Sequence, residues 1–312
     1  MSLRCYFVMA AALAVGLPSV LSGQRIADPN FNTTVTKPAY ANQGPRVLFD
    51  EAHHNIHTAS RLYKPLADLL TADGYRITPN ADGFTSRLLQ RFDILVISNA
   101  LGATALFPPE ASNPSFTPEA SNPAFTTEEA DAVSDWVHGG GALLLIADHA
   151  PMGAANAGLA QRFGVEMSNG RTIDPGNTTP DGKTPGFIVY TRASGLAEHA
   201  ITNGRTPDEH VNRVMTFTGQ SLKGAAGVVA FMKLSETARD VPGSGGPTTS
   251  ASGRAQGVAL SFGSGRVVVL GEAGMLSAQL AGPNQGFLGM NHPGIDNRLL
   301  ALNILHWLSR KI

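Results

Sequence analysis

The feature that most constrains the fold is a series of short apolar runs separated by segments with helical spacing. The predicted strands are Arg46 to Asp50, Tyr75 to Thr78, Asp93 to Ser98 and Ala142 to Ala147. The order strand, helix, strand, helix, strand is typical of a parallel sheet with right-handed crossovers. We therefore expect an α/β fold with a doubly wound, mostly parallel sheet and helices on both of its faces.

The second half of the chain is expected to add a β-rich portion to this sheet. Ser168 to Gly186 and Pro242 to Gly257 are rich in Gly, Pro, Ser and Thr, which predicts loops. Val258 to Phe262 and Arg266 to Leu270 predict a hairpin over a Gly-Ser-Gly turn. Leucines at helical spacing predict a final helix, Asp296 to Arg310, with an apolar face for the sheet.

The N-terminus has the pattern of a cleavable secretory signal over residues 1–23. Arg4 precedes an apolar run, Cys5 to Leu17, and small residues follow it. The run is too short for a comfortable membrane span, so we expect a secreted or periplasmic protein with no stable membrane insertion. Residues 24–45 are predicted to form an arm on the body, and residues 46–312 a single α/β domain.

The composition excludes several classes of function. The formal net charge is −1, and loss of Arg4 with the signal leaves 22 basic and 24 acidic residues, or −2. Such a balance gives no footprint for nucleic acid. Cys5 is the only cysteine, so the mature protein has no disulfide and no cysteine nucleophile. The sequence also lacks the Gly-x-Ser-x-Gly, Walker, Gly-x-Gly-x-x-Gly and His-Glu-x-x-His motifs.

A nine-residue segment occurs twice in tandem, at Pro109 to Thr117 and Pro118 to Thr126. It is too short and too rich in proline for a solenoid repeat, so we interpret residues 109–126 as a duplicated surface loop. A lid and a simple slippage duplication are both open interpretations. Thr126 and Glu129 have the spacing of a capping box that begins the next helix.

Acids and histidines follow three of the predicted strands at the point where each strand ends. Because the carboxyl ends of parallel strands meet at one edge of a sheet, we expect these side chains to converge. The predicted metal ligands are Asp50, His53, His54, Asp148 and His149. The predicted catalytic residues are Asp148, His149 and Glu272, and the predicted substrate contacts are Asn55, Asn291 and His292.

Each of these residues also has a structural interpretation. Asp50 and Asp148 are equally compatible with capping a turn or a helix. One of the adjacent pair His53 and His54 has to point away if the strand geometry continues. His292 precedes a proline and is compatible with a loop residue that bonds the backbone.

A cluster of carboxylates and imidazoles suits a divalent metal ion or proton transfer. The imidazoles favour zinc and the carboxylates equally suit calcium, so the metal stays open. A metal-bound water would hydrolyse a carbonyl compound without a side-chain nucleophile. The hypothesis is an exported hydrolase, a lactonase or esterase, acting on an ester or lactone bond of a small molecule. The alternative is a non-catalytic domain that binds a ligand such as a saccharide or has a structural role in the cell envelope.

Three motifs resemble the class I glutamine amidotransferase-like superfamily. They are Val47 to His53, Gly139 to Ile146 and Gly265 to Glu272. More narrowly, the chain resembles the ThuA-like bacterial branch and the domain shared by gliding-motility and intraflagellar-transport proteins. The resemblance covers roughly residues 46–312 and implies a flavodoxin-like sheet. Amidotransferases carry a cysteine on the turn after a central strand, where this chain has Asp148-His149, so the resemblance does not imply glutaminase activity.

Overall fold

The structure is a computed structural model that describes residues 25–41, 43–102, 123–179, 184, 186–242, 246–282 and 284–312. The predicted signal, residues 1–23, and residues 109–122 of the duplicated loop lie outside the described residues. Among the described residues, no helix is long and apolar enough to cross a membrane.

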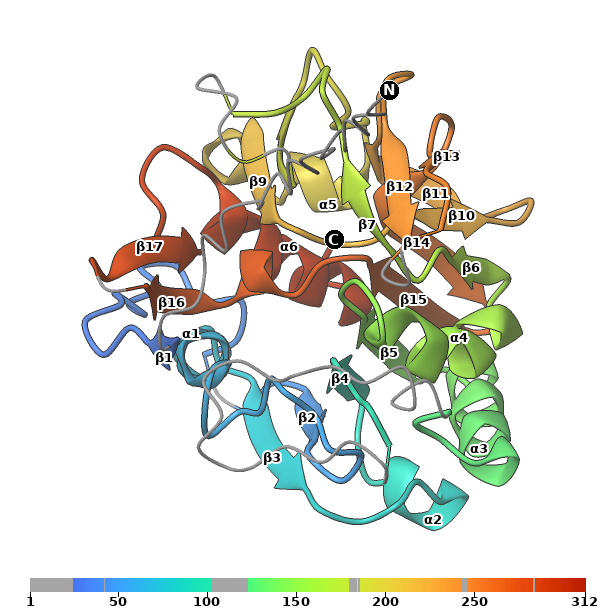
Figure 1. Ribbon diagram of the computed structural model, residues 1–312. Helices are drawn as coiled ribbons and strands as arrows, with labels where there is room; N and C mark the ends of the chain where they lie inside the picture. The colour runs from blue at the N-terminus through green and yellow to red at the C-terminus, as the bar shows by residue number, and fades with distance from the viewer. Residues whose placement is uncertain are drawn as a thin grey trace, which may run out of the picture.

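Five parallel strands form the centre of the molecule (Figure 1). They are β3 (Arg76–Asn80), β2 (Arg46–Asp50), β4 (Ile94–Ser98), β5 (Ala142–Ile146) and β15 (Gly265–Leu270), in that spatial order. In chain order the arrangement is 2-1-3-4-5, which is the strand order of flavodoxin-like sheets. The expected α/β fold with a mostly parallel sheet is thus confirmed.

An antiparallel extension continues the sheet beyond β15. Its strands are β14 (Ala255–Phe262), β10 (Leu222–Gly224), β6 (Val165–Met167) and β11 (Val229–Lys233). β14 pairs with β15 as the predicted hairpin, from Gly257 opposite Leu270 to Phe262 opposite Gly265. The extension is the β-rich portion that the sequence predicted, added to one side of the parallel core.

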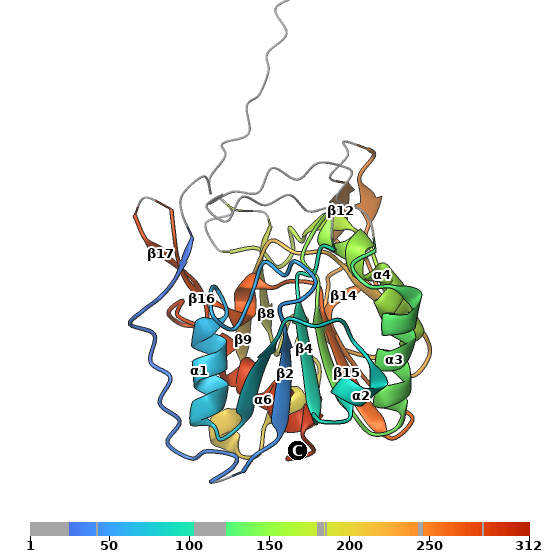
Figure 2. The same ribbon diagram turned by 90° about the horizontal axis from the view of Figure 1, so that it is seen from below.

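Helices cover both faces of the sheet, as Figure 2 shows for α1 on one side and α3 and α4 on the other. Their bounds are α1 (Lys64–Ala72), α2 (Ser86–Leu89), α3 (Thr127–His138), α4 (Met152–Arg162), α5 (Ala200–Asn203) and α6 (Asn297–Leu308). Because strand side chains alternate between faces, the core divides in two. Phe49 and Ile146 belong to the cluster under α1 and α6, whereas Leu48 and Leu145 belong to the cluster under α2, α3 and α4.

Smaller sheets and two 3₁₀ turns lie around the carboxyl edge of the central sheet. The strands are β1 (Ile26–Ala27) with β16 (Ala278–Ala281) and β17 (Gly286–Gly289), β7 (Gly170–Ile173) with β12 (Arg239–Pro242) and β13 (Thr249–Ser250), and β8 (Phe187–Thr191) with β9 (Arg213–Phe217). The turns are η2 (Pro207–Glu209) and η3 (Gly274–Leu276). Predicting plain loops at Ser168 to Gly186 and Pro242 to Gly257 was wrong, because their backbone groups pair with distant strands.

The segment before β2 lies against the body. β1 pairs with β16, with Ile26 opposite Leu280. The backbone N–H of Ala39 donates to Asp73, whose other carboxylate oxygen lies 2.6 Å from His306 Nε2 of α6. Asp73 and His306 are both fully buried. The N-terminal arm is therefore attached at two places to elements that come much later in the chain.

Candidate functional site

Asp148 and Glu272 lie side by side at the carboxyl edge of the sheet. β5 and β15 are parallel neighbours, and Ile146 is the register partner of Leu270. Asp148 and Glu272 each follow the end of their strand by two residues, on the side that continues the α1 and α6 face, and the charge of Asp148 acts directly on Glu272. The strand order and register thus create a pair of carboxyl groups from residues that are far apart in the sequence.

Backbone N–H groups hold both carboxylates. Glu272 is fully buried, and its two oxygens accept from the N–H of Gly274 at 2.6 Å and of Met275 at 2.7 Å. Asp148 is only partly buried and accepts from the N–H of His149 at 2.8 Å. Asp148 is therefore the member of the pair that a substrate or water can approach.

Burial raises the pKa values of both carboxyl groups. The pKa of Glu272 is raised well above its usual range, first by burial and then by the negative charge of Asp148. The pKa of Asp148 is also raised by burial, against the lowering effect of the nearby His149. Two neighbouring carboxyl groups that resist ionisation keep a proton at a pH where isolated carboxyls are ionised.

A second layer of buried polar residues supports Asp148. Asn99, which follows β4, accepts the N–H of Asp148 through Oδ1 at 2.8 Å and donates through Nδ2 to His57 Nδ1 at 3.2 Å. Burial, assisted by the charge of Arg25, lowers the pKa of His57 to about 3, so this imidazole stays neutral. The hydroxyl of Tyr63 donates at 2.7 Å to the carbonyl of Ala273, which is the residue directly after Glu272.

Asp50 and His53 form a separate network. The ring Nδ1 of His53 lies 2.9 Å from Asp50 Oδ1, and Nε2 lies 3.1 Å from Glu129 Oε1 at the start of α3. The His53 ring also packs against Phe84 and Phe125, at centroid distances of 4.6 and 4.7 Å. Burial lowers the pKa of His53, but the two carboxylates outweigh it and the pKa is raised overall.

The alternation of strand side chains explains why these two groups do not meet. Asp50 lies two residues after Leu48 and so faces α3, whereas Asp148 lies two residues after Ile146 and faces α1 and α6. The expectation that all the strand-end acids and histidines share one point was therefore wrong. The structure joins Asp148 and Glu272 and directs Asp50 to the other face of the sheet.

The other predicted residues have the following positions. Asn55 is buried and donates to Asp50 Oδ2 at 3.0 Å. His54 is exposed, which agrees with one of the adjacent histidines pointing away. Asn291 donates to Asp28 at 3.0 Å, and His292 Nδ1 bonds the carbonyl of Pro293 at 2.9 Å. Asn55, Asn291 and His292 thus have partners within the chain, and their contact with a substrate stays a prediction.

The donor sets fit a resident metal ion poorly. Among the residues that the structure describes, no group of three or more His, Asp or Glu side chains is placed to hold one. Both ring nitrogens of His53 face carboxylates, and both oxygens of Glu272 accept backbone N–H groups. A metal would have to replace these bonds, so we derive no chemical step through it.

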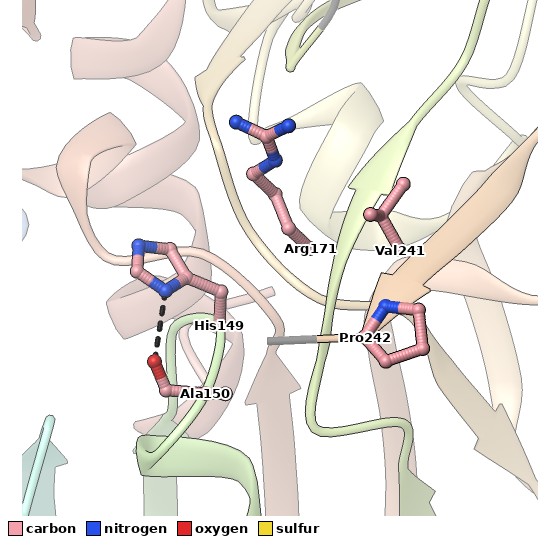
Figure 3. A pocket seen from close by; sticks show the side chains of 5 residues that line it. All are labelled: His149, Ala150, Arg171, Val241 and Pro242. Carbon is pink, nitrogen blue, oxygen red and sulfur yellow. Dashed lines mark hydrogen bonds between the residues drawn. The ribbon is translucent and has the colours of Figure 1, made fainter. Parts of the chain in front are cut away.

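A cavity of about 230 Å³ opens at the segment that follows Asp148 in the chain. Its walls are His149 and Ala150 from the segment after β5, Arg171 from β7, and Val241 and Pro242 from β12. His149 lies on one side and Val241 and Pro242 on the other, with the Arg171 side chain between them (Figure 3). His149 Nδ1 donates to the Ala150 carbonyl at 3.0 Å, which means that Nδ1 carries the proton.

Sequence patterns did not identify several residues of this region. His57, Tyr63 and Asn99 follow predicted strands, but nothing in their spacing ties them to Asp148. Arg171 lies in a segment predicted to be a loop, where a lone arginine carries no signal. Only Asn99, one residue beyond a predicted strand, could have been found by extending the strand-end argument.

No family model and no curated protein matches the chain. Among solved structures, it is similar to the mmIFT52 N-terminal domain, with a TM-score of 0.59 and 14% identity over 84% of this chain and 97% of that domain. A cytoplasmic protein from Salmonella typhimurium matches with a TM-score of 0.48 and 14% identity, covering 85% of this chain and 98% of that one.

A ThuA-like protein from Parabacteroides merdae matches with a TM-score of 0.45 and 12% identity, covering 86% of this chain and 91% of that one. The solved structures that resemble the chain thus include ThuA-like proteins. At such identities the likeness to the mmIFT52 domain shows a shared fold and nothing about activity.

Proposed function

We propose that this protein is an exported hydrolase that opens an ester or lactone bond of a small molecule. The observation that carries the proposal is the Asp148–Glu272 pair, two adjacent carboxyl groups with raised pKa values at the carboxyl edge of an α/β sheet. Ligand sites in such sheets lie at this edge, and perturbed acids are a mark of acid–base sites. We also propose membership of the amidotransferase-like superfamily, without its cysteine.

The partly exposed Asp148 acts as the general base. Its carboxylate removes a proton from a water molecule as the water oxygen attacks the substrate carbonyl, and the same proton then passes to the leaving oxygen. Glu272 does not reach the substrate. It is a positioning residue: the charge of Asp148 raises the pKa of Glu272 further, so Glu272 keeps its proton while Asp148 is ionised.

The first test is a screen of chromogenic esters and lactones with the mature protein. Asp148→Asn is expected to reduce kcat by about 10²–10⁴-fold, the usual contribution of a general base. Glu272→Gln is expected to leave the acidic limb of the pH–rate profile close to that of wild type, because both the protonated Glu272 and the neutral amide place no charge beside Asp148. Glu236→Gln, at an exposed acid away from the site, is the control and is expected to retain wild-type activity.

Each assay is run with and without EDTA, because the sequence predicts a zinc or calcium ion, whereas the donor sets of the described residues fit one poorly. Loss of activity in EDTA that one divalent ion restores would support metal assistance. Full activity in EDTA would support the carboxylate mechanism alone. An Asp148→Asn variant with wild-type kcat would contradict both.

The cavity favours a second candidate, a ligand-binding domain without catalysis. At about 230 Å³ it is large enough for a small ligand or for one part of a larger one. This alternative is supported if a ligand binds, no ester or lactone is turned over, and Asp148→Asn leaves binding unchanged.

A further inference from the structure

We infer that the cavity lined by His149 and Arg171 selects small molecules that carry a carboxylate, with Arg171 as the residue that binds it. The inference rests on the proposed function in one respect, that the bound molecule is the substrate. The anion specificity itself depends only on the cavity and its lining residues.

Arg171 is the cationic side chain among the five that line the cavity. It is exposed, and β7 holds its backbone in register with Val241 of β12, so that the two side chains share one face of their small sheet. The strand pairing therefore fixes the origin of the Arg171 side chain at the cavity wall. Its guanidinium is drawn beside the cavity, between His149 and Val241 (Figure 3).

The remaining walls indicate the rest of the ligand. Val241 and Pro242 offer apolar surface on the side opposite His149 (Figure 3). A single guanidinium matches a planar carboxylate with two parallel hydrogen bonds, whereas a phosphate dianion is usually bound by several donors. The lining thus fits a compact acid with a short apolar chain better than a phosphate ester or a neutral sugar.

The position of His149 connects this cavity to the proposed chemistry. His149 lines the cavity, and its backbone N–H donates to Asp148 Oδ1 at 2.8 Å. A substrate of the proposed hydrolase whose carboxylate is bound by Arg171 would have its ester group on the His149 side of the cavity, which is the side that Asp148 adjoins in the chain. The expected substrate class is therefore a monoester of a short dicarboxylic acid, or a lactone with a free carboxylate.

The test measures binding directly, so that it does not depend on turnover. Monomethyl succinate and its neutral analogue methyl butyrate are titrated by calorimetry into the mature wild-type protein and into the variants Arg171→Gln and Arg239→Gln. Arg239 is a matched control, because it is an exposed arginine of the adjacent strand β12 and does not line the cavity.

We expect the wild type and Arg239→Gln to bind the anionic ester about tenfold or more tightly than the neutral one, as a charge-assisted bond implies. Arg171→Gln is expected to lose this preference while its circular dichroism and unfolding midpoint stay those of the wild type. Equal binding of the two esters, a preference that survives in Arg171→Gln, or no binding of either ester would overturn the inference.

The result also separates this inference from the proposed hydrolase. Binding that depends on Arg171, without hydrolysis of either ester, leaves the anion site valid and contradicts the hydrolase. Hydrolysis that depends on Asp148, with no preference for the anionic ester, supports the hydrolase and contradicts the anion site.

Discussion

Replacing His53 with leucine tests the buried network on the α3 face of the sheet. The His53 side chain is 8% exposed and lies between Asp50, which is fully buried, and Glu129, which is 17% exposed. Leucine keeps much of the contact with the neighbouring aromatic rings but removes both N–H groups. Asp50 is then left without its imidazole partner in a site that water does not reach.

Removing one partner of a buried ion pair costs about 3–5 kcal/mol of unfolding free energy. Asp50 would keep the Asn55 amide at 3.0 Å and the Ala52 N–H at 3.2 Å, and Glu129 would keep its backbone donors. We therefore expect the lower end of the range, about 3 kcal/mol. For a domain of this size that loss lowers Tm by roughly 6–12 °C.

The loss should also depend on pH. The folded-state pKa of His53 is raised above its unfolded-state pKa of 6.5. The charged imidazole therefore contributes fully to stability below pH 6.5, and this contribution is lost as the pH rises through the folded-state pKa. Urea unfolding followed by circular dichroism at about pH 6 and about pH 9 measures both effects. The deficit of His53→Leu relative to wild type is expected to be larger at the lower pH.

His210→Leu, at an exposed histidine, is the control and is expected to change stability by less than about 0.5 kcal/mol. The reasoning is refuted if His53→Leu unfolds within about 1 kcal/mol of the wild type at pH 6. It is also refuted if the deficit is the same at both pH values.

Three further outcomes are expected. Asp148→Asn should be more stable than wild type at about pH 8, because a carboxyl group whose folded-state pKa is raised destabilises the fold at every pH above its unfolded-state pKa. The difference in unfolding free energy should become smaller toward pH 4, which urea midpoints at several pH values would measure. His57 should stay neutral from pH 5 to 8, so its ring NMR signals should not titrate; a pKa near 6.5 would contradict its burial. Gly265→Ala should destabilise the fold by about 1–3 kcal/mol, because the new Cβ would lie 2.0 Å from a carbonyl oxygen of α3. Gly158→Ala in α4 is the control: no atom lies within 4 Å of its new Cβ, so the same unfolding experiment should show a neutral or stabilising effect.

Much of the fold could be predicted because it depends on local patterns. The runs around Val47, Leu95 and Leu144 are apolar on both faces and were placed as strands within a residue or two of their bounds. The capping box at Thr126 and Glu129 is present, with both of its hydrogen bonds. These features follow from side-chain periodicity and from the need to satisfy the first N–H groups of a helix, which neighbouring residues decide.

Other local predictions were wrong because distant contacts decide them. Ser168 to Gly186 was expected to be a loop, but it contains β7, which pairs with β12. Pro242 to Gly257 was also expected to be a loop, but it contains β13 and the start of β14. Weak strands of this kind are stabilised by partners that sequence patterns do not reveal.

By itself, the sequence determined that acids follow the strands, and the alternation of side chains determined the face of the sheet to which each acid points. It could not determine that β5 and β15, more than a hundred residues apart in the chain, pair so that Ile146 lies opposite Leu270. That register is set by backbone hydrogen bonds between strands and by the packing of helices on both faces. Only the tertiary structure therefore decided that Asp148 meets Glu272, while Asp50 bonds His53 on the opposite face.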